Sequence, residues 1–186
     1  MIMWTAEEVG IIGGNHYIKS HKSEEKDLQF VLESDLGTFK PLGFEVTGTE
    51  EVMCILKRIM KLVCKTKLKR NVRKDNCLIL RCSTLVIFYF FFFIFRLFSI
   101  VGDMKLRSPN GGPDIASWVD AGVPGGSLWT QDEQYFYYHH TNADTMLVED
   151  PDALDRGTAL FAALSYVLAE LSVDLPHHKW QYYWYY

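Results

Sequence analysis

Short apolar runs recur along the chain and predict buried strands. They lie at residues 2–5, 28–32 and 123–129, and the last of them contains two glycines. A stretch with several chain-breaking residues lies between the second and third runs and predicts a loop, with Gly37, Pro41, Gly43 and Gly48 as its breaking positions.

Apolar residues at helical spacing predict helices between these runs. Acidic residues open one helical pattern over residues 7–18, and a short helix is expected at 114–121. Thr47 and Glu50 have the spacing of a capping box in front of a third helix. Asp150 precedes a proline and predicts the N-cap of the last helix. Alternating strands and helices predict an α/β layer architecture.

The composition is that of a globular chain. Hydrophobic residues make up 48% and charged residues 23% of the 186 positions, which excludes a wholly disordered or collagen-like chain. The formal net charge of −4 gives no case for a nucleic-acid partner.

Four cysteines lie between positions 54 and 82, and no pair has CxxC spacing, so a structural zinc finger is not expected. Cys54 and Cys64 lie on an apolar helical pattern, which favours buried free thiols. The N-terminal residues turn acidic too early for a signal peptide.

Residues 65–102 differ in character from both flanks. Six of the ten residues at 65–74 are basic, and an apolar, phenylalanine-rich run follows at 77–101. Phenylalanine codons are all pyrimidine, so the run resembles the tract before a splice acceptor and favours a retained intron. A membrane helix with basic flanks and a family-specific insertion are the alternatives. The aromatic tail at 177–186 shows no usable pattern.

Polar side chains that can bind a metal follow strand-like runs at three places. These are Glu7 with Glu8, Asp35, and the histidine pair 139–140. Each has a structural alternative: acids at a helix start complement its dipole, and a turn aspartate or a loop histidine is often solvated. In open α/β sheets, however, ligands bind at such strand ends. Carboxylate and imidazole ligands together predict a zinc site, and a further carboxylate can act as a base.

An ordered set of motifs resembles the co-catalytic zinc peptidases, a family that includes the Vibrio-type aminopeptidases. The resemblance covers roughly residues 3–63 and 104–176. The motifs are Trp4-Thr5-Ala6-Glu7-Glu8-x-Gly10, Glu33-Ser34-Asp35-x-Gly37-Thr38-Phe39, Gly112-Pro113-Asp114-Ile115, Ala121-Gly122-Val123-Pro124-Gly125 and Tyr138-His139-His140-x4-Thr145-Met146.

The resemblance implies a fold and a role for each motif residue. The fold would be a mixed sheet flanked by helices, incomplete here and interrupted by an apolar insertion. Glu7 matches the general base, Glu8 and His140 match ligands of one zinc, and Asp35 matches a ligand of the second zinc. A complete family enzyme binds two Zn²⁺ ions and hydrolyses dipeptides or other small peptides. Asp144 matches a loop position and is not expected to be a ligand.

The family pattern also has an upstream histidine and an aspartate that bridges both metals. Neither is in this sequence, which begins three residues before Trp4. Two dications about 3.5–4 Å apart need that bridging anion to offset their repulsion. We therefore expect the C-terminal half of a zinc metallodipeptidase or carboxypeptidase, poorly active by itself. The alternative is a catalytically inactive, membrane-associated remnant.

The expected domain organisation follows from these boundaries. Residues 1–64 and 103–176 would form the catalytic domain, 65–102 an insertion, and 177–186 a tail. A small peptide is the expected partner, nucleic acid is not, and the 77–101 run would provide any membrane contact. The resemblance leaves a homodimer open and implies an extracellular or lysosomal location.

Overall fold

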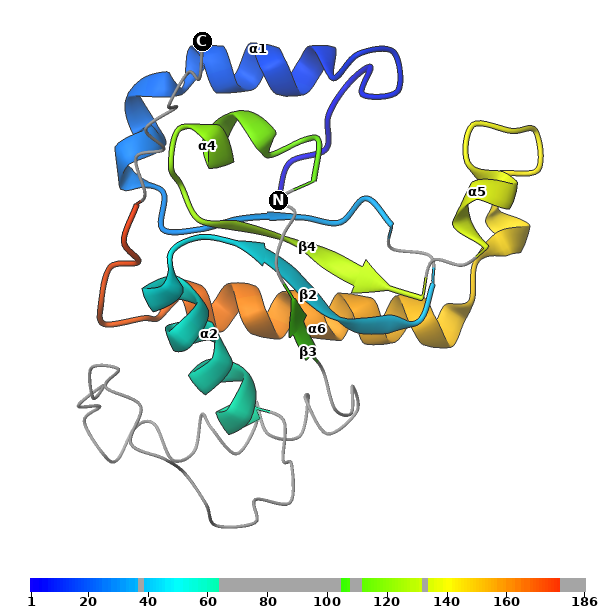
Figure 1. Ribbon diagram of the computed structural model, residues 1–186. Helices are drawn as coiled ribbons and strands as arrows, with labels where there is room; N and C mark the ends of the chain where they lie inside the picture. Colours follow the sequence, from blue (N-terminus) through cyan, green and yellow to red (C-terminus); the bar gives the residue numbers. More distant parts are fainter. Residues whose placement is uncertain (37–38, 64–104, 108–111, 132–133, 178–186) are drawn as a thin grey trace, which may run out of the picture.

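The computed structural model describes residues 1–36, 39–63, 105–107, 112–131 and 134–177. Four strands form one sheet in the order β1-β4-β2-β3 (Figure 1). The strands are β1 (Val31–Glu33), β2 (Pro41–Thr47), β3 (Lys105–Arg107) and β4 (Gly125–Thr130). The α-helices are α1 (Ile12–Ser20), α2 (Glu50–Val63), α4 (Ala116–Asp120), α5 (Tyr135–Tyr138) and α6 (Pro151–Ala169), with 3-10 turns η1 (Lys22–Asp27) and η2 (Met146–Val148).

The sheet is mixed, and helices cover both of its faces. Strand β1 pairs parallel with β4, β2 pairs parallel with β3, and β2 runs antiparallel to β4. Helices α1 and α4 lie on one face, and α2 and α6 lie on the other (Figure 1). The predicted α/β class with a mixed, helix-flanked sheet is therefore confirmed.

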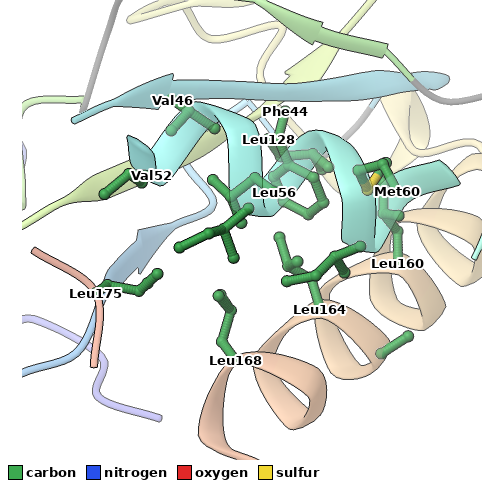
Figure 2. Close-up of a cluster of buried hydrophobic side chains, with 13 residues drawn as sticks. Phe44, Val46, Val52, Leu56, Met60, Leu128, Leu160, Leu164, Leu168 and Leu175 are labelled. Atoms are coloured by element: carbon green, nitrogen blue, oxygen red, sulfur yellow. The ribbon is translucent and has the colours of Figure 1, made fainter. Parts of the chain in front are cut away.

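The larger core lies between the sheet and helices α2 and α6. Phe44 and Leu128 project from β2 and β4 toward Leu56 of α2 and Leu164 of α6 (Figure 2). Phe44 and Leu56 are fully buried, and Leu164 is 1% exposed. Because each buried leucine or phenylalanine contributes about 1.5–3 kcal/mol by leaving water, this layer anchors the sheet on which the site is built.

A smaller aromatic core covers the opposite face. Val31, Trp118 and Val123 are buried there, and Trp4 and Tyr17 pack against them. The Trp4 ring lies 5.3 Å from Tyr17 and 6.3 Å from Trp118, measured between ring centroids. This cluster holds the N-terminal segment against α4, and so it places the residues that follow Trp4 near the end of β1.

The starts of α6 and α2 test the two helix caps predicted from the sequence. The Asp150 carboxylate accepts hydrogen bonds from the backbone N–H groups of Asp152 and Ala153, which confirms the predicted N-cap of α6. The predicted capping box before α2 is wrong in register. Thr49, rather than Thr47, accepts the N–H of Val52, because Thr47 is the last residue of β2.

Several predicted elements differ in the structure. Residues 2–5 form no strand, since Trp4 is used in the aromatic core, and α1 begins at Ile12 rather than at residue 7. The predicted loop at 37–48 is wrong for residues 41–47, which form β2. Gly43 lies at a register irregularity of that strand, so this glycine marks a β-bulge rather than a loop. Strand β3 was not predicted.

The prediction that Cys54 is a free thiol is wrong, because Cys54 is disulfide-bonded. The other three cysteines lie outside the described residues. The basic and phenylalanine-rich segment at 65–102 also lies outside them, and the described residues resume at 105. In the part of the chain that is described, no helix has the length and apolar character needed to cross a bilayer.

Candidate active site

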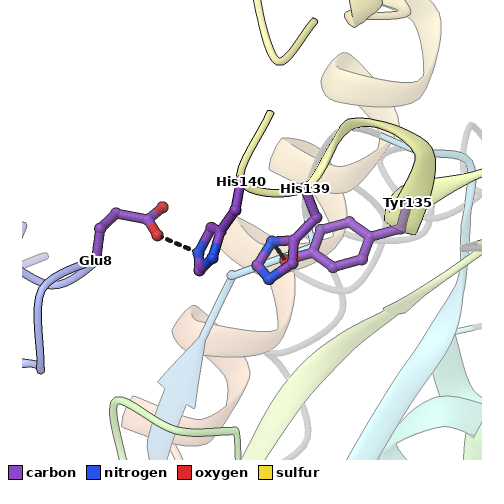
Figure 3. A network of polar contacts seen from close by, with 4 residues as sticks. All are labelled: Glu8, Tyr135, His139 and His140. Atoms are coloured by element: carbon purple, nitrogen blue, oxygen red, sulfur yellow. Dashed lines mark hydrogen bonds and ion pairs between the residues drawn. The ribbon is translucent and has the colours of Figure 1, made fainter. Parts of the chain in front are cut away.

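Glu8 and His140 form the contact around which the site is built. Glu8 follows Trp4 in a turn closed by hydrogen bonds from the N–H groups of Gly10 and Ile11 to the Glu7 carbonyl. His140 lies two residues beyond the end of α5. The His140 Nε2 atom lies 2.5 Å from Glu8 Oε2 (Figure 3). The two side chains are 59% and 69% exposed, so the contact adds little to stability and places both groups at an accessible surface.

Tyr135 and His139 support the His140 ring. The Tyr135 hydroxyl lies 2.8 Å from His139 Nδ1, and the His139 ring stacks on His140 with their centroids 3.8 Å apart (Figure 3). One turn of α5 separates Tyr135 from His139, which brings the two side chains onto the same side of this short helix. A histidine whose ring is fixed in this way is a better-oriented ligand than one free to rotate.

Asp35 lies two residues beyond the end of β1. Burial, followed by the negative charge of Glu8, raises the pKa of its carboxyl, while His139 and His140 act in the opposite direction. Asp35 is therefore close enough to the Glu8–His140 contact to interact with it electrostatically. The parallel pairing of β1 with β4 places the ends of both strands at one edge of the sheet, and the chain after β4 leads to α5.

Glu7 lies beside the same group of charges. Its pKa is raised first by burial and then by the charges of Asp114, Glu8 and Asp35, while His140 lowers it. Glu7 therefore neighbours the residues it was predicted to join. A carboxylate whose pKa is raised is a stronger proton acceptor than an unperturbed one.

Two further acids belong to this region and were missed in the sequence. Glu33 is 6% exposed, and its Oε2 atom accepts hydrogen bonds from the N–H groups of Asp114 (3.0 Å) and Ile115 (3.2 Å). Burial, followed by the charges of Asp114 and Asp35, raises the pKa of Glu33 to about 7. Burial and then Asp35 raise the pKa of Asp114. Strand alternation could have identified Glu33 as a buried position, since residues two apart in a strand lie on one face and Val31 is buried.

Tyr135, at the start of α5, lies among the same charges. Its pKa is raised to about 12, first by burial and then by the charges of Asp35, Glu8, Asp144 and Glu7. The hydroxyl therefore stays protonated at neutral pH and can donate a hydrogen bond to His139 Nδ1.

The expected strand-end placement is correct for only one of the three segments. Asp35 follows β1, but Glu8 lies in a turn before α1, and His140 follows the short helix α5 rather than a strand.

No set of three or more histidine, cysteine, aspartate or glutamate residues within the described ranges is close enough together to hold a metal ion. Glu8 and His140 offer one carboxylate and one imidazole, which fits two of the four ligands of a zinc ion in donor type. The buried Oδ1 of Asp114 has no hydrogen-bond partner among the described residues, which is consistent with a missing positive group.

Comparisons with known proteins agree with this reading of the motifs. No protein-family model matches the chain. Carboxypeptidase Q of Xenopus laevis is 32% identical over 176 residues, and that of Homo sapiens is 31% identical over the same number. Each match covers 95% of this chain and 30% of the relative, so the chain spans about 30% of the length of the curated relatives that it matches.

A solved structure supports the fold independently. The crystal structure of a peptidase M28 precursor from Shewanella amazonensis superposes with a TM-score of 0.68 at 24% sequence identity. The superposition covers 95% of this chain and 32% of that chain. Along 95% of its own length, this chain is therefore similar to a part of carboxypeptidase Q, in agreement with the peptidase resemblance of its motifs.

Proposed function

We propose that this chain forms part of a zinc-dependent peptidase that hydrolyses dipeptides or other small peptides. The observation that carries the proposal is the contact between Glu8 and His140, with Asp35 and Glu7 in electrostatic reach. The similarity to carboxypeptidase Q supports the peptidase class, and the carboxylate and imidazole donors support zinc.

The residues of this chain have distinct tasks in that reaction. Glu8 and His140 would hold one zinc ion, and Asp35 would serve a second. Zinc, when bound, lowers the pKa of a water and polarises the substrate carbonyl. Glu7 would accept the proton of the attacking water at its carboxylate and return it to the leaving amine. Tyr135 keeps the histidine pair oriented through its hydrogen bond to His139.

The residues of the family pattern that lie upstream of Glu7 are not part of this sequence. We therefore expect this chain to bind at most one zinc ion and to turn over a free-ended dipeptide weakly or not at all. Two bound zinc ions and ordinary turnover of about 1–10³ per second, abolished by Glu7→Gln, would contradict that expectation.

We also infer an extracellular or lysosomal location from the resemblance. The disulfide at Cys54 supports an oxidising compartment.

Zinc binding by the purified chain tests the site itself. Calorimetric titration should show that His140→Ala and Glu8→Gln each weaken zinc binding by more than tenfold. His16→Ala is the matched control, because His16 is an exposed histidine on α1. If the His140→Ala and control variants bind zinc alike, the assignment of the site is wrong. The competing membrane-associated remnant would bind no zinc and would partition into vesicles.

A further inference from the structure

The turn at residues 6–11, which carries the two candidate glutamates, is closed at its base by backbone atoms of α1. This turn precedes the helix and is drawn in dark blue (Figure 1). The N–H groups of Ile12 and Gly13, the first two residues of α1, donate to the carbonyls of Ala6 (3.1 Å) and Thr5 (2.9 Å). The path of the turn therefore depends on how closely residues 5 and 6 lie against the helix.

Gly13 permits this close approach. A Cβ at this position would lie 2.6 Å from the Thr5 carbonyl oxygen and 2.7 Å from the Thr5 nitrogen. Both are backbone atoms, so no side-chain rotation would relieve the contact, and the segment before the turn would have to move. A Cβ at Gly14 would lie 3.6 Å from the Trp4 ring, which is itself packed in the smaller aromatic core. With no side chain at either glycine, residues 4 and 5 lie directly against α1.

Left-handed backbone occurs at both ends of the turn. Ala6 has a φ of 56° and Ile11 a φ of 55°, and the contact partner His140 also has a φ of 56°. L-residues avoid this region, and β-branched residues such as isoleucine avoid it most strongly. Such conformations persist where the surrounding structure enforces them, and they cluster at functional sites. Here the hydrogen bonds to α1 and the contact at Gly13 enforce them.

The backbone of the turn, rather than side-chain packing, places Glu8. Its side chain is 69% exposed, so few neighbours restrict it, and it meets His140 at the surface. A change in the path of residues 5 and 6 would therefore move the carboxylate relative to the imidazole. Two ligands of one zinc ion each need a bond of about 2.0–2.2 Å, so even a small displacement matters.

We propose that Gly13 is a positioning residue for the zinc site. By admitting the Thr5 backbone against α1, it holds the turn in the left-handed path that presents Glu8 to His140. The proposal rests on the proposed zinc function and adds to it a residue that touches neither metal nor substrate. A single methyl group at position 13 should weaken zinc binding, although alanine is a better helix former than glycine.

Calorimetric zinc titration of Gly13→Ala tests the proposal. Binding should be about 10–100-fold weaker than in the wild type, as is typical when a support of a metal ligand is lost. Gly157→Ala is the matched control and should bind zinc as the wild type does, because a Cβ there would meet Leu128 Cδ2 at 3.4 Å, an ordinary van der Waals contact within α6. Urea unfolding with EDTA present shows whether each variant is folded. A folded Gly13→Ala variant with wild-type zinc affinity would overturn the proposal.

A pair of substitutions at Ala6 keeps the test decisive if Gly13→Ala does not fold. Ala6→Gly accepts the φ of 56° without a steric penalty, whereas Ala6→Val places a β-branched residue there. Zinc binding should be about tenfold weaker in Ala6→Val and unchanged in Ala6→Gly. Equal zinc affinities of these two variants would overturn the proposal.

A measurement without metal separates this proposal from the proposed function. In ¹H–¹³C NMR spectra of the metal-free chain, Glu8→Gln should shift the ring signals of His140 in the wild-type and Gly157→Ala backgrounds. It should leave them in place in the Gly13→Ala background, or in Ala6→Val if the former does not fold, because the contact is already lost. Equal shifts in every background, or no shift in any, would overturn the role of Gly13. If the wild type binds no zinc, the proposed function fails, and this measurement still decides whether Gly13 places Glu8.

Discussion

Replacing Glu33 by glutamine should remove a pH dependence of stability that this one carboxyl imposes on the chain. Glutamine keeps an oxygen that can accept the N–H groups of Asp114 and Ile115, as Glu33 Oε2 does. It cannot ionise, however. The perturbation therefore isolates the cost of charging a carboxyl that is 6% exposed and lies among other acids.

The sign and size of the effect follow from the pKa. In the folded chain the pKa of Glu33 is raised from 4.5 to about 7, so the native state holds this proton more tightly than the unfolded chain does. Between these values the unfolded state loses the proton first, and stability falls as the pH rises. A rise of about 2.5 units corresponds to about 3 kcal/mol at ~1.36 kcal/mol per unit. That amount of stability is present below pH ~4.5 and lost above pH ~7.

Urea unfolding with EDTA present, at pH 4.5 and at pH 8, measures this quantity in the wild type and in Glu33→Gln. The wild type should lose about 3 kcal/mol more than the variant between the two pH values. Asp155→Asn, at an exposed acid of α6, is the control and should follow the wild type. If the wild type and Glu33→Gln lose the same amount, Glu33 is not the titrating group and the reasoning fails.

Three further substitutions test the core packing, the N-cap of α6 and the turn at Gly112. Leu164→Ala should lower the free energy of unfolding by about 2–5 kcal/mol, because Leu164 is 1% exposed in the larger core; a loss below 1 kcal/mol in urea denaturation would contradict the packing. Asp150→Ala should cost about 1 kcal/mol through the lost N-cap of α6, and Asp150→Asn should retain most of it in the same assay. Gly112→Ala should lower the thermal midpoint, since the residue has φ 69° and contacts the Glu33 carboxyl group; an unchanged midpoint would show that the turn can adjust.

The elements that could be predicted from the sequence are those whose signals are local. Asp150 followed by proline marks the start of α6, so its N-cap was predicted. Strand β4 was recognisable because it lies in the short, glycine-containing apolar run at 123–129. In the segment that forms β2, the glycines and the proline predicted a loop, and the apolar residues between them were not recognised as a strand. Only pairing with β4 along its length shows that those residues are extended.

The candidate site shows the same division between local and long-range information. The motif order singled out Glu8 and His140, which are 132 positions apart, and the structure brings them into contact. Glu33 and Asp114 are 81 positions apart, and no local pattern marks their hydrogen bond. It depends on the position of the turn before α4 over the end of β1, which is a property of the assembled sheet. The ligand roles of Glu8, Asp35 and His140 stay predictions until zinc binding is measured.

The concentration of acids at this edge of the sheet opposes folding. The carboxyl groups involved all have raised pKa values, and in each case burial is the first cause: Glu7, Glu33, Asp35 and Asp114. Groups shifted in this way cluster at functional sites more often than elsewhere. A positive guest converts the unfavourable interactions into favourable ones.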